Sequence, residues 1–150
     1  MNIGFTGTRI GMTSHQCGEF YNVLSNLEDF VASFHHGDCI GADDAAANIF
    51  DDWRNEPGEG GEMRVVCHPP VDDTHRAFNP HADETREPKT HFARNRDIVD
   101  ETELLIACPQ YMDPITKDTQ GGTAYTVNYA RKRGKPVWIV RPDGSVERDS

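Results

Sequence analysis

The chain has 150 residues, of which 36% are hydrophobic and 27% are charged, and this size and composition fit one compact domain. Its 25 acidic residues outnumber 15 lysines and arginines, giving a net charge of -10. This charge repels the phosphate backbone of DNA or RNA, so the composition disfavours a nucleic-acid partner.

The four cysteines, Cys17, Cys39, Cys67 and Cys108, stand far apart and form no C-x-x-C pair. This spacing fits neither a zinc knuckle nor a redox motif, so we expect reduced, mostly buried thiols. The first residues lack a basic stretch followed by an apolar one, and no apolar run is long enough to cross a bilayer. We therefore expect a cytoplasmic protein that has no membrane partner.

Short apolar runs alternate with helical patterns, which is typical of a parallel sheet covered by helices on both faces. The predicted strands span Asn2–Phe5, Phe30–Phe34, Met63–Cys67, Glu103–Ala107 and Pro136–Val140. We therefore predict an α/β fold. It is a single three-layer domain over residues 1–150 with a mostly parallel sheet of about five strands.

Helical periodicity connects these strands. The first helix begins after Thr13, whose hydroxyl can form a capping box with Gln16. Further helical patterns span Ala42–Trp53, Phe92–Val99 and Thr123–Arg133. The last of these ends in basic residues, which suit the negative end of the helix dipole.

Two stretches are too irregular to be short connections. Asn55–Gly61 is rich in glycine and glutamate, and we interpret it as a solvated loop. The long segment Pro69–Lys89 carries four prolines. A segment of this kind is usually a lid, a binding loop or a disordered excursion, and the sequence favours none of these.

Two glycine- and threonine-rich turns predict a phosphate pocket. Gly7-Thr8-Arg9 follows the first strand, and Gly121-Gly122-Thr123 opens the last helix. Glycine lets the backbone approach a ligand, threonine adds a hydroxyl, and a helix N-terminus offers free N–H groups. The planar guanidinium of Arg9 can hold a phosphate with two parallel hydrogen bonds. In an open parallel sheet, such a pocket lies beyond the carboxyl ends of the strands.

The loop after the second strand carries Gly37 and Gly41 and leads into a helix that begins with small residues and Asp43. It can wrap a sugar or a phosphate, or it can be an ordinary strand-to-helix connection with an acid at the helix start. A second cationic pair, Arg94 and Arg96, flanks Asn95. Either one of the two points into the pocket or both are solvated and bonded to nearby carboxylates.

Histidines and acids near the long segment do not form a recognisable metal motif. None of the histidine pairs has the helical spacing of the common zinc motif, so we expect no metal site. The histidines considered are His68, His75, His81 and His91.

Four motifs, in this order, resemble the SLOG superfamily of Rossmann-like domains: Gly-Thr-Arg, His-Gly-x-x-x-Gly-Ala-Asp, Arg-Asn-Arg and Gly-Gly-Thr-Ala. This group includes the DNA-processing protein A core, the Lonely-guy phosphoribohydrolases and the small YspA-type proteins, which are the most similar in size and motif position. The resemblance covers Ile3–Val140. It implies one SLOG-like Rossmann domain over residues 1–150, with a long irregular loop at about 69–89.

The resemblance further implies a pocket for a nucleotide or a nucleotide-derived ligand, without an organic cofactor. The ligand-binding residues that match family positions are Gly7, Thr8, Arg9, Gly37, Gly41, Asp43, Arg94, Gly121, Gly122 and Thr123.

Three functions are compatible with this pocket. The leading hypothesis is binding of the ligand as a sensor or carrier. The alternative is a nucleoside-monophosphate N-glycosidase. The family glutamate of that reaction aligns with Thr126, so Asp43 is the expected catalytic carboxylate and Asp38 the second choice. The third hypothesis is single-stranded DNA binding, which the net charge disfavours. A homodimer is compatible with the family, and the sequence leaves it open.

Overall fold

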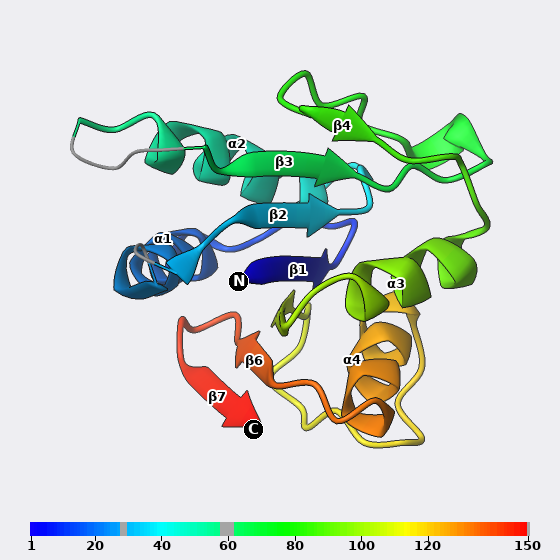
Figure 1. Cartoon of the computed structure of the whole chain (residues 1–150). Helices are drawn as coiled ribbons and strands as arrows, with labels where there is room; N and C mark the ends of the chain where they lie inside the picture. The colour runs from blue at the N-terminus through cyan, green and yellow to red at the C-terminus, as the bar shows by residue number, and fades with distance from the viewer. Residues whose placement is uncertain (28–29, 58–61, 150) are drawn as a thin grey trace.

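The structure, a computed structural model, describes residues 1–27, 30–57 and 62–149. Within these residues, seven strands form one sheet in the order β4-β3-β2-β1-β5-β6-β7 (Figure 1). The strands are β1 (Asn2–Gly7), β2 (Ser33–His36), β3 (Arg64–Cys67), β4 (Glu84–Thr85), β5 (Leu104–Cys108), β6 (Val137–Val140) and β7 (Val146–Asp149). All neighbours are parallel except β6 and β7. The predicted α/β, mostly parallel fold is confirmed, and the strand number is corrected from five to seven.

The two strands that the sequence did not predict lie at the sheet edges. β4 consists of Glu84 and Thr85 alone, and β7 is largely charged and partly exposed. Neither has the apolar run that marks a strand buried on both faces. β2 also begins later than predicted, because it pairs with β1 from Asn2 opposite Ser33 onward.

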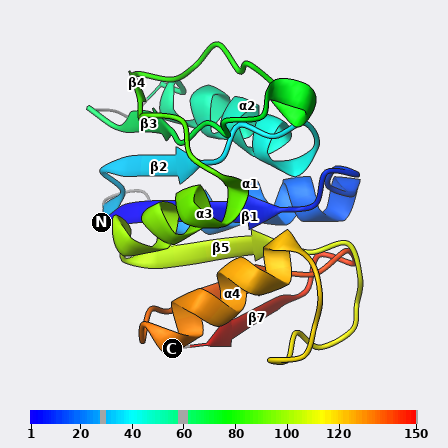
Figure 2. The ribbon, with the colours of Figure 1, turned by 90° about the vertical axis from the view of Figure 1, so that its right-hand side faces the viewer.

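Two helices cover each face of the sheet: α1 (Ser14–Leu27) and α2 (Ala42–Arg54) on one, α3 (His91–Asp100) and α4 (Gly122–Lys132) on the other. Figure 2 shows α3 and α4 in front of the sheet, with α1 and α2 behind it. The predicted capping box is present, since the Gln16 N–H donates to Thr13 Oγ1 and the Thr13 N–H donates to Gln16 Oε1, both at 3.0 Å.

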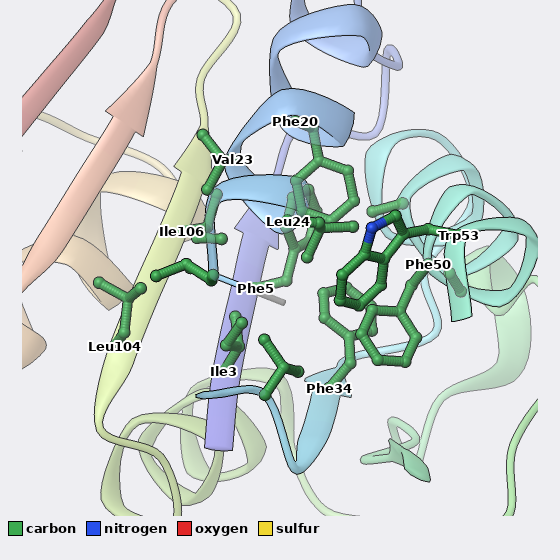
Figure 3. Close-up of a cluster of buried hydrophobic side chains, with 14 of the residues drawn as sticks. Ile3, Phe5, Phe20, Val23, Leu24, Phe34, Phe50, Trp53, Leu104 and Ile106 are labelled. Atoms are coloured by element: carbon green, nitrogen blue, oxygen red, sulfur yellow. The ribbon is translucent and has the colours of Figure 1, made fainter. Parts of the chain in front are cut away.

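The larger hydrophobic core lies between β1, β2 and the α1–α2 pair (Figure 3). Phe34 of β2 stacks on Phe50 of α2, with ring centroids 4.8 Å apart and planes at 14°. An aromatic pair of this kind contributes about 1 kcal/mol beyond the area it buries. Other large side chains of this core are Phe5, Phe20, Leu24 and Trp53. The four cysteines are free thiols, and three of them are buried.

The segment after β3 is anchored to the loop between β2 and α2. It contains a 3-10 turn, η2 (Asp73–His75), followed by β4. The buried Asp38 accepts a hydrogen bond from Arg76 Nε at 2.9 Å and another from the Asn79 N–H at 2.9 Å. These contacts favour an ordered edge element over a disordered excursion. Residues 58–61 of the predicted solvated loop lie outside the described residues.

No helix in the described part of the chain is long and apolar enough to cross a membrane. The cytoplasmic location stays a prediction.

Candidate functional site

A cavity of about 890 Å³ opens beyond the carboxyl ends of β1 and β5. The strand order reverses between these two strands, and ligands of open α/β sheets bind at such a switch point. The volume is within the range of about 300 to 1,000 Å³ that is typical of small-molecule sites. Its walls come from the β1–α1 turn, the start of α3, the β5–α4 loop and the start of α4.

Eight of the ten residues predicted to bind the ligand line this cavity. They are Gly7, Thr8, Arg9, Asp43, Arg94, Gly121, Gly122 and Thr123. Both turns that the sequence marked as anion sites therefore face the same space. Gly37 and Gly41 are not among the lining residues.

The first turn of α4 presents free backbone donors to the cavity. Gly121 precedes the helix with φ 108°, and no side chain caps it within the described residues. The N–H groups of Gly122, Thr123 and Ala124 have no acceptor there, because the first helical hydrogen bond runs from the Tyr125 N–H to Gly121 O. These three donors and the positive end of the helix dipole favour an anion.

Arg9 is a cation at the cavity wall whose guanidinium is available to bind such an anion. Its side chain is exposed at the cavity wall and makes no hydrogen bond or ion pair with the described residues. The turn that carries it is shaped by the Ile10 N–H, which donates to Thr8 Oγ1 at 3.2 Å.

Arg94 behaves differently, because its guanidinium is buried and already bonded. Nη1 donates to the carbonyl oxygens of Gly37 and His68, the latter at 3.1 Å. Nη2 contacts Cys39 Sγ at 3.2 Å and His91 Nδ1 at 3.1 Å, and Nε donates to the side chain of Asn95. Arg94 therefore joins the β2–α2 loop, the end of β3 and α3. Neither sequence interpretation, a pocket-facing cation or a solvated surface pair, describes this role.

The glycine at position 37 is explained by the same contact, since a Cβ there would lie 2.5 Å from Arg94 Nη1. Gly41 has φ 92°, and a Cβ there would lie 2.3 Å from the carbonyl oxygen of Arg9. The Ala42 N–H donates to Thr8 O at 2.9 Å. The N-terminus of α2 is thus docked on the Gly-Thr-Arg turn, and these two glycines serve packing at the pocket wall.

We expect Gly41→Ala to destabilise the protein and Gly18→Ala to stabilise it. The backbone conformation at Gly41 alone costs an alanine about 1 to 3 kcal/mol, and the contact with Arg9 adds to this. Gly18 lies inside α1 with open space around it, so alanine there should contribute about 0.5 to 1 kcal/mol. Urea unfolding of both variants measures the difference, and equal stabilities would contradict the docking of α2 on the turn.

Asp43 is a buried carboxyl group at the cavity wall. Burial raises its pKa to about 6, although the Arg94 charge and the Cys39 N–H, which donates to Oδ2, act in the opposite direction. A carboxyl group with a pKa near neutrality can exchange a proton at the pH of the cell.

This pKa predicts how Asp43→Asn should change stability with pH. The folded protein holds the proton of Asp43 more tightly than the unfolded chain, so ionised Asp43 costs stability near neutral pH. The Asp43→Asn variant should therefore be more stable than the parent by about 1 to 3 kcal/mol near neutral pH. The advantage should shrink as pH falls through about 6 towards 4. Denaturant unfolding across this range tests it, and an advantage that grows on acidification would contradict the assignment.

The structure also adds cavity residues that the sequence did not single out. Phe92 at the start of α3 and Tyr111 in the β5–α4 loop line the cavity and are 52% and 64% exposed. Phe92 packs on Tyr125, with ring centroids 4.3 Å apart. The position of ligand sites beyond the carboxyl ends of strands does not predict these residues, because nothing in the sequence shows how the loop after β5 folds back towards the cavity.

Three other features singled out in the sequence lie away from the cavity. Asp38 is committed to Arg76 and Asn79. Thr126, at the position of the family glutamate, donates its hydroxyl to Gly122 O at 2.8 Å within α4, and it does not line the cavity. The segment 69–89 contributes no lining residue, which disfavours the lid interpretation.

The fold defines the chain as a Rossmann-like α/β domain with a cavity at the switch point of the sheet. No family model matches the chain, and no curated protein matches its sequence. Solved structures do match it, and they confirm the Rossmann-like fold that the resemblance implied.

The molybdenum cofactor binding protein of Rippkaea orientalis has a TM-score of 0.66 and 18% identity, over 93% of this chain and 76% of that one. The molybdenum cofactor carrier protein of Chlamydomonas reinhardtii has a TM-score of 0.60 and 18% identity, over 92% and 74%. DNA processing protein A of Helicobacter pylori, described with its single-stranded DNA binding mode, has a TM-score of 0.62 and 16% identity. This chain covers 64% of the length of that protein.

Proposed function

We propose that the chain binds a nucleotide or a nucleotide-derived molecule in the cavity beyond β1 and β5, as a carrier or sensor. The observation that carries the proposal is the convergence on one cavity of Arg9 and the N-terminus of α4, neither of which has its donors satisfied by the described residues. A phosphate group satisfies both, since it accepts hydrogen bonds from the backbone N–H groups of α4 and from the guanidinium of Arg9.

The remaining walls suit the rest of such a ligand. Phe92 and Tyr111 offer exposed aromatic rings on which a heterocyclic base can stack. Two structural neighbours are named as binding or carrying a small-molecule cofactor, and this supports carriage over turnover.

A thermal-shift screen tests the proposal. The panel holds nucleoside mono-, di- and triphosphates, cyclic nucleotides, ADP-ribose and ribose 5-phosphate. A ligand at a hundred times its dissociation constant adds about 2.7 kcal/mol, which raises the midpoint by several degrees in a domain of this size. We expect such a shift for at least one compound, and a shift of half that size or less in Arg9→Ala at the same ligand concentration. No shift across the panel would overturn the proposal.

Asp43 supports a second function, cleavage of the bond between base and ribose in a nucleoside monophosphate. It lines the cavity, and its raised pKa of about 6 suits a group that gives or takes a proton. The carboxylate can also stabilise the positive charge that develops on the ribose.

Incubation of the protein with the nucleotide that binds best distinguishes carriage from cleavage, and chromatography measures the free base that is released. Asp43→Asn should abolish release and leave binding largely intact if the chain is a glycosidase. Binding without any release in the parent protein would leave the carrier role alone.

Because the fold is similar to that of DNA processing protein A, we also propose to test single-stranded DNA as a ligand. The net charge of -10 opposes this partner. Retention of the chain on a single-stranded oligonucleotide at physiological salt, in preference to every mononucleotide, would replace the small-molecule proposal.

A further inference from the structure

A group of metal-ligating side chains lies on the sheet face that carries α3, outside the cavity described above. His35 is in β2, His68 directly follows β3, and Glu101 caps the C-terminus of α3. Each offers one ligand atom, and these three atoms lie within 4.8 Å of one another. His35 and His68 are 4% and 2% exposed, respectively.

The orientation of the two imidazoles follows from their neighbours. Ser33 Oγ donates to Asn2 Oδ1 at 2.7 Å, so it can only accept from His35 Nε2, which lies 3.0 Å away. His35 therefore carries its proton on Nε2, and its Nδ1 lone pair points at His68 Nε2, at 2.8 Å. A metal-binding histidine is typically held in this way, with its second N–H donated to a fixed acceptor.

The Glu101 carboxylate has one oxygen that is available to bind an ion. Arg86 uses only Oε1 of Glu101, through Nε at 3.1 Å and Nη2 at 2.6 Å. Oε2 has no hydrogen-bond partner among the described residues. Arg86 also pairs with Glu84, which in turn pairs with Arg64 at 3.4 Å, so Glu101 is not the sole partner of the Arg86 guanidinium. Side chains of Arg86 and Glu101 are 39% and 34% exposed, which gives an ion a path from solvent.

We propose that His35 Nδ1, His68 Nε2 and the Glu101 carboxylate bind a divalent transition-metal ion. Two imidazoles and one carboxylate form a donor set that suits Zn²⁺ and Co²⁺, with a fourth position open to water. On binding, the ion takes the place of the hydrogen between His35 and His68, and the proton of His68 moves from Nε2 to Nδ1. No other atom is lost or gained.

The site would tie β2, β3 and α3 together beside the nucleotide cavity. Arg94, which lines that cavity, donates to the carbonyl oxygen of His68 at 3.1 Å. The metal site is thus a structural neighbour of the cavity. The proposal of a metal ion does not depend on which ligand the cavity binds. Sequence spacing did not reveal it, because its ligands come from three separate elements.

Titration of metal-free protein with Co²⁺, followed by visible absorption, tests the proposal. We expect tetrahedral d–d bands that saturate at one equivalent and are displaced by Zn²⁺. His68→Gln should abolish the bands, and His15→Gln, which changes an exposed histidine on α1, should leave them unchanged. Zn²⁺ should raise the melting midpoint of the parent protein and not that of His68→Gln.

Glu101→Gln keeps the proposal testable if His68→Gln fails to fold. The amide oxygen that this change introduces can still accept from Arg86, so the apo-protein should keep its melting midpoint, while Co²⁺ affinity should fall at least tenfold. Unchanged affinity in this variant would overturn the proposal. So would thiolate charge-transfer bands, which would place the ion on cysteines instead, or the absence of any d–d bands in the parent.

Discussion

Replacing Arg9 by alanine should raise the dissociation constant of the best nucleotide by about tenfold to a hundredfold. A charge-assisted hydrogen bond contributes about 1.5 to 3 kcal/mol, and this variant removes it. The fold should be unaffected, since the Arg9 side chain makes no hydrogen bond or ion pair with the described residues. Isothermal titration calorimetry measures the affinity, and thermal melting without ligand measures the stability.

The matched control is Arg133→Ala. Arg133 caps the C-terminus of α4, at the opposite end of the helix from the cavity, and its side chain pairs with Asp100 at 3.3 Å. This variant changes the net charge by the same amount and should leave nucleotide affinity unchanged. Equal losses in both variants would mean that general charge, and not a contact at the cavity, governs binding.

Replacing Arg94 by methionine should destabilise the protein by about 3 to 5 kcal/mol. The change keeps an unbranched stem but leaves the carbonyl oxygens of Gly37 and His68 without their donor and removes the positive charge that acts on Asp43. Arg94→Lys should recover only part of the loss, because an ammonium group cannot reproduce the planar fork of donors. Urea unfolding gives both values.

Arg96→Met provides the comparison. Arg96 is two residues away on the same helix, is exposed, and donates to the hydroxyl of Tyr125 at 2.7 Å. Its loss should cost less than about 1 kcal/mol. If Arg94→Met were as mild as this control, Arg94 would not be the cross-link described above, and its charge would be free to serve the ligand.

Much of the fold was predictable because buried strands and amphipathic helices leave strong patterns. The capping box at Thr13 and Gln16 formed as predicted, since both of its bonds are local. β4 and β7 could not be predicted, because an edge strand needs no apolar run and its pairing depends on distant residues.

The cavity could be predicted in outline for a similar reason. Ligand sites of open parallel sheets lie beyond the carboxyl ends of the strands. This principle placed the turns Gly7 to Arg9 and Gly121 to Thr123 at one edge of the sheet, and both turns line the cavity. The role of Arg94 could not be predicted, because its acceptors come from Gly37, Cys39 and His68. Only the fold brings these three acceptors to the Arg94 guanidinium.

The most direct test of the account is an amide chemical-shift titration of the ¹⁵N-labelled protein with ribose 5-phosphate. If this cavity binds a phosphate, the largest shifts should fall on the N–H groups of Gly122, Thr123 and Ala124 and on the turn at Thr8 and Arg9. In Arg9→Ala the same shifts should require about tenfold to a hundredfold more ligand. Shifts centred on residues remote from both turns, or no shifts at millimolar ligand, would contradict the phosphate pocket.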